Sequence, residues 1–333
     1  MTLMKVSSME RKIQEFIVNA RGMELFTCRW VPAESEAKAL ILLCHGYGVG
    51  CSISMRGAAT RLAKAGYEVY GMDYEGHGKS SGLQGFVPCF DDVVSDCSHH
   101  YTSICEREEN RNKLRIVMGE SMGGAVALLL HRKKPHFWDG AILVAPMCKI
   151  ADGMRPHPLM IKVLRKLSRL IPTWKITPIP DIIDAAVRDA SVREQIPSNP
   201  YCYKGRLRLL TGYQLLTVSM DLEKRLEEVS LPFLVLHGEE DKVTDPAVSR
   251  LLYDSARTPI RDKTLKLYPE MWHSLYYGEL PHNIDTVFSD ILAWLDERLA
   301  SSSSDNLERQ LKLENDNDVP AASSTDHTHT HAF

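Results

Sequence analysis

Short apolar runs alternate with helical patterns along most of the chain. The runs that predict β-strands cover residues 25–30, 40–44, 68–72, 114–118, 140–144, 233–237 and 265–268. A helical period of apolar positions appears between and after them, over residues 54–64, 91–105, 122–132 and 286–299. Strands that alternate with helices are typical of a mostly parallel sheet with helices on both faces, so the expected fold class is α/β.

The alternation of strands and helices breaks between residues 149 and 230. This segment is long, contains several prolines and shows no convincing strand pattern. It predicts an insertion between two strands, folded as a helical cap. The expected organisation is a discontinuous core formed by residues 1–148 and 231–300, a cap formed by residues 149–230, and a tail formed by residues 301–333.

The first helix of the cap is expected to start near Pro158 and to have two unlike faces. The apolar face carries Met160, Val163, Leu164, Leu167 and Leu170, and the basic face carries Lys162, Arg165, Lys166 and Arg169. Two interpretations are open. The helix packs on the cap's own core and leaves its basic face in water, or it lies at a membrane surface, contacts anionic lipid and admits an acyl chain.

The tail is rich in Ser, Asn, Asp and Thr and ends in alternating histidines, His327, His329 and His331. Such a composition buries too little apolar surface to fold, so residues 301–333 are predicted to be disordered. Alternating histidines on a flexible end are weak support for a metal site, and we predict no structural metal.

Composition and charge place the chain among ordinary globular enzymes. Of its 333 residues 44% are hydrophobic and 25% are charged, and the net charge of −3 gives no indication of a nucleic-acid partner. Residues 1–12 lack the apolar run of a secretory signal, and no stretch approaches the ~20 apolar residues that span a bilayer. The eight cysteines are scattered without metal-ligand spacing. We therefore expect a cytoplasmic protein with reduced thiols.

One motif carries most of the chemistry. The strand expected over 114–118 runs straight into Gly119-Glu-Ser121-Met-Gly123-Gly124, and a helix of small residues follows at once. A GxSxG motif on a sharp strand-to-helix turn exposes a serine nucleophile, and its glycines avoid clashes in the turn. Ser121 is therefore the predicted nucleophile.

A second GxSxG match shows why the context matters. Residues 78–82 also fit the motif, but they follow a Gly-His-Gly turn and precede another glycine-rich stretch. We interpret this copy, which contains Ser80, as a loop after the strand expected over 68–72.

A serine hydroxyl needs a base, and the base needs an acid that holds its tautomer. In this type of turn-based site the order along the chain is Ser, then Asp or Glu, then His, each after a strand. His273 follows the last predicted strand, whereas His282 lies too far along to reach the same edge. After the strand expected over 233–237, the residues alone leave the acid open among Glu239, Glu240, Asp241 and Asp245. Asp245 precedes Pro246 and is also a good helix N-cap.

Two backbone N–H groups are expected to stabilise the oxyanion of an acyl-transfer reaction. One belongs to Met122, the residue after the nucleophile, and the other to Tyr47 in the loop after the strand expected over 40–44. Gly46 would let the backbone approach closely there.

Several motifs together resemble the monoacylglycerol lipase family, in its plant branch of caffeoylshikimate esterase and lysophospholipase-like proteins. They are the runs HGYG at 45–48, GHG at 76–78, GESMGG at 119–124, SNP at 198–200 and MWHS at 271–274, within a resemblance over residues 15–299. The resemblance implies an α/β-hydrolase fold with an eight-stranded type of sheet and a helical cap. It assigns the catalytic triad to Ser121, Asp241 and His273 and the oxyanion donors to Tyr47 and Met122. It implies no cofactor.

The predicted function is hydrolysis of carboxylic esters, with monoacylglycerol as the favoured substrate. Alternatives are a phenolic-ester esterase of the caffeoylshikimate type, a lysophospholipase, an acyltransferase, and a catalytically silent ligand-binding module. The expected partner is a small ester or lipid, with peripheral membrane contact through the cap. The cap residues expected to contact substrate are Leu159, Val163, Leu164, Trp174 and Tyr213.

Overall fold

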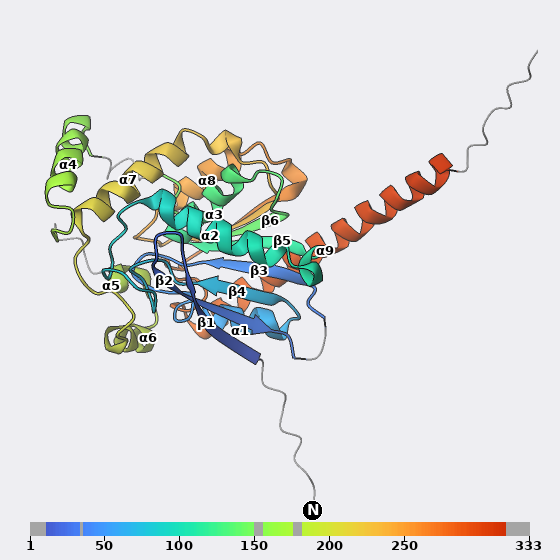
Figure 1. Cartoon of the computed structure of the whole chain (residues 1–333), viewed down its shortest axis with the longest axis horizontal. Helices are drawn as coiled ribbons and strands as arrows, with labels where there is room; N and C mark the ends of the chain where they lie inside the picture. Colours follow the sequence, from blue (N-terminus) through green and yellow to red (C-terminus); the bar gives the residue numbers. More distant parts are fainter. Residues whose placement is uncertain (1–10, 34–35, 150–155, 176–181, 318–333) are drawn as a thin grey trace, which may run out of the picture. The chain divides into compact units, whose positions relative to one another are not determined.

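A computed structural model describes residues 11–33, 36–149, 156–175 and 182–317. Eight strands form one sheet in the order β1-β2-β4-β3-β5-β6-β7-β8 (Figure 1). Their bounds are β1 Arg11–Val18, β2 Glu24–Val31, β3 Ala39–Cys44, β4 Glu68–Met72, β5 Leu114–Glu120, β6 Gly140–Val144, β7 Phe233–Gly238 and β8 Lys263–Tyr268. β2 runs antiparallel to β1 and to β4, and all the other neighbours are parallel. The mostly parallel α/β sheet predicted from the sequence is confirmed.

All seven predicted strands are present, and their ends move by no more than two residues. The sequence analysis missed β1, the edge strand. In β1 the apolar residues Phe16 and Val18 are 57% and 68% exposed. The strand therefore lacks the alternation of apolar and polar positions that marks a half-buried strand in a sequence. Its backbone pairing with β2 over the whole length defines it instead.

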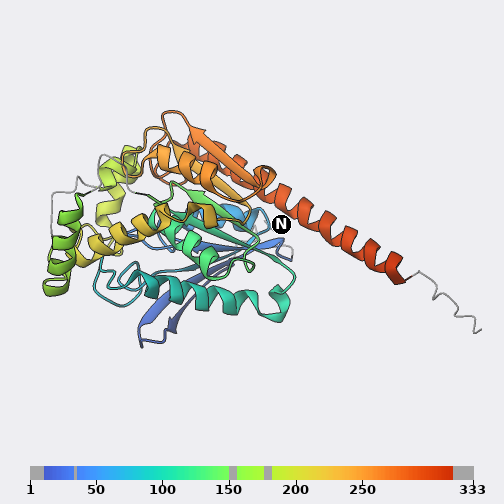
Figure 2. The ribbon, with the colours of Figure 1, turned by 90° about the horizontal axis from the view of Figure 1, so that it is seen from above.

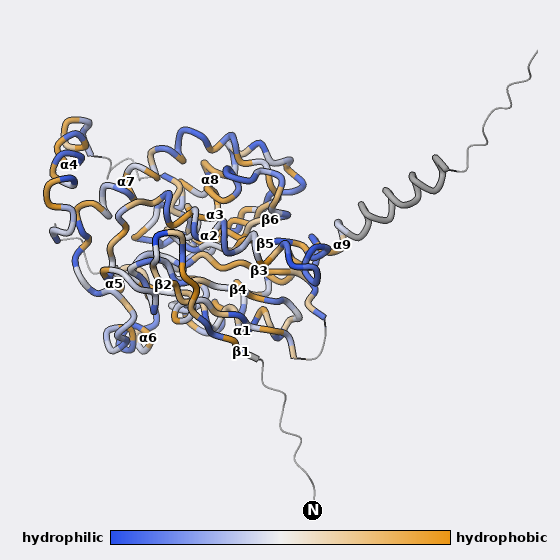
Figure 3. The backbone as a smooth tube through the Cα atoms, viewed as in Figure 1, coloured by the Kyte–Doolittle hydropathy of each residue, from blue (hydrophilic) through white to orange (hydrophobic). Residues whose placement is uncertain are grey.

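Helices cover both faces of the sheet, as parallel strands require. α1 (Arg56–Lys64) packs on β4 and β2. α2 (Phe90–Cys105) and α3 (Met122–Lys133) lie together over the opposite face, where their side chains join Leu42 and Val117 in one core cluster (Figure 1). β3 and β7 are buried along their whole length, and the centre of the sheet is among the most apolar parts of the chain (Figure 3).

Between β6 and β7 the described residues form four α-helices: α4 Pro158–Leu170, α5 Ile182–Ala186, α6 Ala190–Gln195 and α7 Leu209–Glu223. α4 and α7 pack against each other, as Figures 1 and 2 both show. Their place in the chain fits the predicted insertion, although the division into core and cap stays a prediction. The other helices before α9 in the described ranges are α8 Pro246–Ser255 and four short 3-10 helices, η1 Glu108–Asn110, η3 Ile196–Ser198, η4 Leu226–Glu228 and η5 Ile260–Asp262.

The apolar stripe of α4 is largely exposed. Met160 is 55% exposed and Leu170 is 76% exposed, and Val163 and Leu167 also lie open to solvent, as does Leu159 next to the stripe. The buried residue of α4 is the small Ser168. The interpretation in which this stripe packs into a core of the cap is therefore wrong for most of its residues.

The C-terminal helix α9 covers Pro281–Asn317. It begins in a compact unit that ends at Leu292 and continues into a second unit that starts at Ala293. The tail predicted to be disordered from residue 301 is thus helical as far as Asn317. The run NLERQLKLE at 306–314 explains this, because Leu, Glu, Arg, Gln and Lys all favour helices. Residues 318–333, with the three terminal histidines, lie outside the described residues. None of the described helices has the length and apolarity needed to cross a bilayer.

Candidate active site

Ser121 stands at the sharp turn between β5 and α3. Its φ of 54° and ψ of −119° are strained for a residue with a side chain. The turn is fixed by backbone hydrogen bonds, because the N–H of Ser121 donates to Val144 at 2.9 Å and its carbonyl accepts from Gly124 and Met147, each at 2.9 Å. The strand-turn-helix expected around the GxSxG motif is therefore present, with the serine at its apex.

The glycines of the motif are needed because backbone passes close to them. A Cβ at Gly119 would lie 2.2 Å from the carbonyl oxygen of Gly123. A Cβ at Gly123 would lie 1.9 Å from the carbonyl oxygen of Cys44, at the end of β3. No side chain fits at such distances, so the sequence of the turn and its shape depend on each other.

The second GxSxG match has a different structure. Ser80 lies in a loop after β4, and no helix follows it directly. Its hydroxyl donates to the carbonyl of Asp73 and accepts from the N–H of Phe26. These bonds hold the loop against β2, as the interpretation of this copy as a loop requires.

Asp241 and His273 meet beyond the ends of β7 and β8. Nδ1 of His273 lies 2.6 Å from Oδ2 of Asp241. The carboxylate of Asp241 also accepts from the backbone N–H groups of Val243 and Thr244 at 2.7 and 3.0 Å and from the hydroxyl of Thr244 at 2.9 Å. The Asp241 side chain is fully buried and that of His273 nearly so. This geometry holds the imidazole with Nδ1 as donor and leaves Nε2 available as a base.

The other acids near the end of β7 are occupied elsewhere. Asp245 is the N-cap of α8, where it accepts from the N–H of Ala247 at 2.9 Å and precedes Pro246. Glu239 accepts from Arg250 at 3.2 Å, and Glu240 is exposed. Among the described residues, Asp241 is the acid whose carboxylate contacts His273.

His237 is a further residue at this acid that the sequence analysis missed. Its Nε2 lies 3.0 Å from Oδ2 of Asp241 and 3.1 Å from the carbonyl of Thr244, so this nitrogen carries the proton. Its Nδ1 lies 2.6 Å from the hydroxyl of Ser249. A histidine at the end of the otherwise apolar run FLVLHG was the signal that could have revealed it.

The charges of this group shift its pKa values. Burial alone would raise the pKa of Asp241, but the charge of His273 and the hydrogen bonds from His237 and His273 outweigh burial and hold this pKa well below its usual range. Burial alone would lower the pKa of His273, but the charge and hydrogen bond of Asp241, with the charge of Glu120, raise it above its ordinary value. Asp241 is thus ionised and ready to stabilise an imidazolium.

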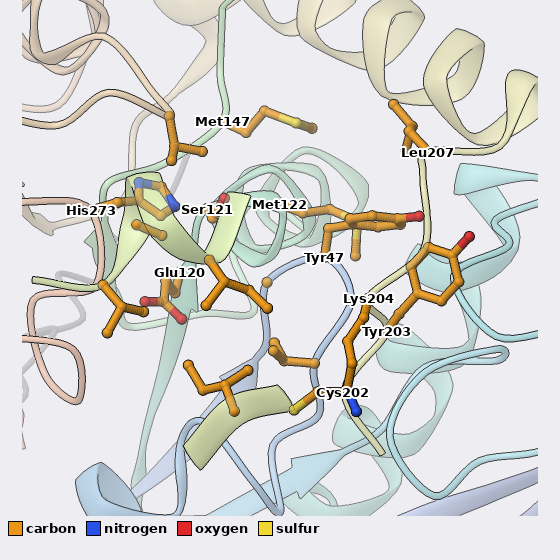
Figure 4. Close-up of a pocket in the computed structure, with 18 of the residues that line it drawn as sticks. Tyr47, Glu120, Ser121, Met122, Met147, Cys202, Tyr203, Lys204, Leu207 and His273 are labelled. Atoms are coloured by element: carbon orange, nitrogen blue, oxygen red, sulfur yellow. The ribbon is translucent and has the colours of Figure 1, made fainter. Parts of the chain in front are cut away.

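Ser121 and His273 open onto one cavity of about 400 Å³ (Figure 4). Its apolar walls come from loops and helices on both sides of the serine. They include Met147, Ile183, Val187, Ile196, Leu207 and Leu215. Tyr203 and Tyr277 also line it. The volume is in the range of small-molecule sites, and a largely apolar wall favours a hydrocarbon group.

The two residues predicted as oxyanion donors line the same cavity. Met122 is the first residue of α3, so its N–H is one of those that a helix leaves without an acceptor of its own. Tyr47 directly follows Gly46 after β3. Its phenol donates to the carbonyl of Gly85 at 2.8 Å, so the side chain has a structural bond of its own.

The five cap residues expected to contact substrate are not among those that line this cavity. Leu159, Val163 and Trp174 are 64%, 45% and 59% exposed, and Leu164 and Tyr213 are partly buried elsewhere. The chain between β6 and β7 contributes Ile183, Ile196 and the run 202–207 instead, which the sequence analysis did not single out. Because those residues come from loops and very short helices, they lack the helical periodicity that drew attention to α4.

Comparisons with known proteins show the family of this chain. A family model described as serine aminopeptidase, S33, matches residues 35–280. The chain belongs to this family, Hydrolase_4. Among curated relatives of this Hydrolase_4 protein, caffeoylshikimate esterase of Arabidopsis thaliana is 31% identical over 84% of each chain. Monoglyceride lipase of Mus musculus is 30% identical over 86% of this chain and 92% of the mouse protein.

Solved structures show the same fold. A soluble variant of monoglyceride lipase from Saccharomyces cerevisiae, in complex with a substrate analog, has a TM-score of 0.74 at 22% identity and covers 88% of this chain and 97% of its own. The monoacylglycerol lipase of Paleococcus ferrophilus has a TM-score of 0.71 at 21% identity, covering 83% and 100%. The α/β-hydrolase fold and the resemblance to monoacylglycerol lipases and the plant esterase branch are confirmed.

Proposed function

We propose that this protein is a cytoplasmic serine hydrolase that cleaves carboxylic esters through Ser121, His273 and Asp241. The observation that carries the proposal is the 2.6 Å contact between His273 and Asp241 beside a cavity that also exposes the strained Ser121. The names of the curated relatives, an esterase and monoglyceride lipases, support the same reaction.

The residues would act in two half-reactions. Ser121 Oγ attacks the ester carbonyl while Nε2 of His273 takes its proton, and the imidazolium then protonates the leaving alcohol. Water, activated by the same histidine, hydrolyses the acyl-enzyme. The N–H groups of Tyr47 and Met122 would stabilise the oxyanion in both steps, and one such donor is typically worth ~10²–10³ in turnover. This chemistry needs no cofactor.

Monoacylglycerol is the substrate that this proposal favours. The aliphatic side chains around the cavity suit a flexible acyl chain, and several relatives are named monoglyceride lipases. A phenolic ester is the second candidate, because a curated relative of similar identity is a caffeoylshikimate esterase. Lysophospholipids and acyl transfer to an alcohol use the same acyl-enzyme.

The decisive experiment replaces the nucleophile. Ser121→Ala should abolish turnover of a short p-nitrophenyl ester and labelling by a fluorophosphonate probe, with an unchanged melting temperature. Ser80→Ala is the matched control from the other GxSxG match, and it should keep its labelling and its activity per folded molecule. Retained hydrolysis in Ser121→Ala would overturn the proposal, and failure of the wild type to label would favour a silent binding module.

A substrate panel would rank the esters. Purified protein should be compared on monoacylglycerols of graded chain length, lysophosphatidylcholine, caffeoylshikimate and an aminoacyl amide, the last because the family model is described as a peptidase. We expect the highest kcat/KM for a monoacylglycerol. A higher kcat/KM for caffeoylshikimate would contradict the monoacylglycerol proposal and favour a phenolic-ester esterase. Acylated products formed with an added alcohol would reveal acyl transfer.

The exposed stripe of α4 supports peripheral contact with a membrane. It presents Leu159, Met160 and Leu170 beside the exposed cations Lys162 and Arg169. Anionic lipid would attract the cations while the apolar side chains enter the interface. Binding to anionic liposomes should weaken as salt rises and should weaken further in Lys162→Glu/Arg169→Glu. Liposome binding that changes neither with salt nor with these substitutions would contradict the proposed membrane contact of α4.

A further inference from the structure

Glu120 is a buried acid directly before the candidate nucleophile. It ends β5, is 2% exposed and lines the cavity together with Ser121 and His273 (Figure 4). Its Oε2 accepts a hydrogen bond from the hydroxyl of Tyr276 at 2.6 Å. Its Oε1 is fully buried and has no hydrogen-bond partner among the described residues. A buried carboxyl with one oxygen unsatisfied is costly, so its retention at this position calls for a compensating interaction.

Glu68 provides a comparison within the same sheet. It is also buried and also accepts from a tyrosine, since the hydroxyl of Tyr70 lies 2.8 Å from its Oε1. Unlike Glu120, however, Glu68 forms an ion pair with Arg29. In the described part of the chain no arginine or lysine pairs with Glu120, and the cation whose charge acts on it is His273 in its protonated form.

We propose that Glu120 is a positioning residue for His273. Its carboxylate, fixed by the hydroxyl of Tyr276, stabilises the imidazolium that forms when Ser121 gives up its proton. The inference rests on the proposed serine-hydrolase function, in which His273 is the base. Asp241 would then orient the ring through a direct hydrogen bond, and Glu120 would add a second negative charge from the strand that carries the nucleophile.

The surrounding charges fit this role. Burial raises the pKa of Glu120 to about 7, while the charge of His273 and the hydrogen bond from Tyr276 oppose that rise and the charge of Asp241 adds to it. Asp241 contacts Nδ1 of His273 and is bound in turn by His237. Burial and the charge of Glu120 raise the pKa of both Tyr276 and Tyr277 above the ordinary tyrosine value. The charges of Glu120 and His273 therefore act on each other, and the carboxylate of Glu120 is present above about pH 7.

The first test measures His273 directly and needs no substrate. The pKa of its imidazole is followed by NMR, with the resonance assigned by comparison with His273→Gln. Glu120→Gln removes the charge and should lower this pKa by about one unit, in the range expected for a nearby opposite charge. Glu120→Asp keeps a carboxylate and should retain at least half of the effect. A pKa of His273 that is the same in wild type and Glu120→Gln would overturn the inference.

The second test is the pH profile of ester hydrolysis. In Glu120→Gln the acid limb of kcat/KM should move to lower pH by the same interval, and the plateau should fall by up to about tenfold, because one pKa unit is a tenfold change in imidazolium stability. Glu68→Gln is the matched control from the other tyrosine–glutamate pair and should leave the limb in place. A merely structural role for Glu120 would lower the folded fraction without moving the limb.

A third variant protects the test against misfolding. Tyr276→Phe keeps the ring and removes the hydrogen bond that favours the carboxylate, so less of Glu120 is ionised near pH 7. The pKa of His273 should fall in the same direction as in Glu120→Gln, by a smaller amount. An unchanged or higher pKa would count against the inference. Ester hydrolysis that is retained in Ser121→Ala would instead contradict the serine-hydrolase proposal itself, so the two failures can be distinguished.

Discussion

Nδ1 of His273 lies 2.6 Å from Oδ2 of Asp241, across 32 positions of sequence. Four other donors hold the same carboxylate: the N–H groups of Val243 and Thr244, the hydroxyl of Thr244 and the Nε2–H of His237. These bonds hold the acid in place independently of His273. A carboxylate held in this way can only accept from Nδ1, which keeps the proton of a neutral His273 off Nε2.

Asp241→Asn should reduce kcat for a p-nitrophenyl ester by roughly 10³–10⁴-fold, because an amide can stabilise the wrong tautomer and cannot balance the imidazolium charge. Glu240→Gln, an exposed neighbour in the same loop, is the control and should stay within twofold of wild type. Burst kinetics and circular dichroism on the same samples separate a chemical defect from a folding defect. Equal activities in the two variants would remove Asp241 from the proposed triad.

The pH dependence follows from the direction of the shift at His273. The charge and hydrogen bond of Asp241, with the charge of Glu120, outweigh burial and raise its pKa above the ordinary 6.5 of histidine. Because a base must be unprotonated to act, kcat/KM should rise with pH through a midpoint above 6.5. A profile that is already flat at pH 6 would show that His273 does not carry the base function in the free enzyme.

The features set by local rules could be predicted from the sequence. A GxSxG motif between an apolar strand and a small-residue helix identified the Ser121 turn, and the structure explains its glycines, because an added Cβ would lie about 2 Å from neighbouring backbone. The start of α4 was likewise set by a nearby residue, Pro158 in its first turn. The acid was different, because four candidates lay within seven residues and only the family resemblance favoured Asp241.

The walls of the cavity could not be predicted, because distant segments build them together. Ile183, Leu207 and Leu215 reach the site from separate parts of the chain between β6 and β7, and no periodicity relates them. The amphipathic pattern of α4 is present, but its apolar face is exposed to solvent. Periodicity identifies an apolar face and does not show what covers it. Glu120 and His237 escaped notice for another reason: each is a polar residue at the end of an apolar strand, where a turn is normally expected.

Glycine positions allow a test of the turn with an internal control. Gly123→Ala would place a Cβ 1.9 Å from the carbonyl oxygen of Cys44 and 2.8 Å from that of His45, so backbone must move. We expect activity to fall at least a hundredfold and the melting temperature to drop. Gly57→Ala is the matched change in α1, where a Cβ meets nothing within 4 Å. Gly57 lies in the first turn of α1, so the variant should be as stable as wild type or more stable by less than about 1 kcal/mol, and it should leave activity unchanged.

The same measurements would expose an error in the geometry of the turn. An active Gly123→Ala variant would mean that the end of β3 and the start of α3 are farther apart than the structure has them. Urea unfolding monitored by tryptophan fluorescence gives the stability of both variants, and p-nitrophenyl ester hydrolysis gives their activity. If Gly57→Ala also inactivates the protein, the loss in Gly123→Ala cannot be assigned to the contact with Cys44.

The buried side chain of His77 should make the free energy of unfolding depend on pH. Its side chain is buried, with Nδ1 3.0 Å from the carbonyl of Glu75 and Nε2 without a hydrogen-bond partner in the described structure. Burial lowers its pKa to about 4, against the ordinary 6.5 expected when the chain unfolds. Between these values the unfolded state binds the proton and the folded state does not, so the free energy of unfolding must fall as the pH falls through this window.

The size of this effect sets the experiment. A difference of roughly 2.5 pKa units corresponds to about 3 kcal/mol between pH 7.5 and pH 4. Urea unfolding at half-unit intervals of pH should show this loss in wild type and a clearly shallower slope in His77→Gln, in which the titrating group is gone. His99→Gln changes an exposed histidine on α2 and should keep the wild-type slope. If His77→Gln retains the full loss of stability in acid, the folded protein protonates His77 readily, and the loop that carries GHG is more open to water than its packing indicates.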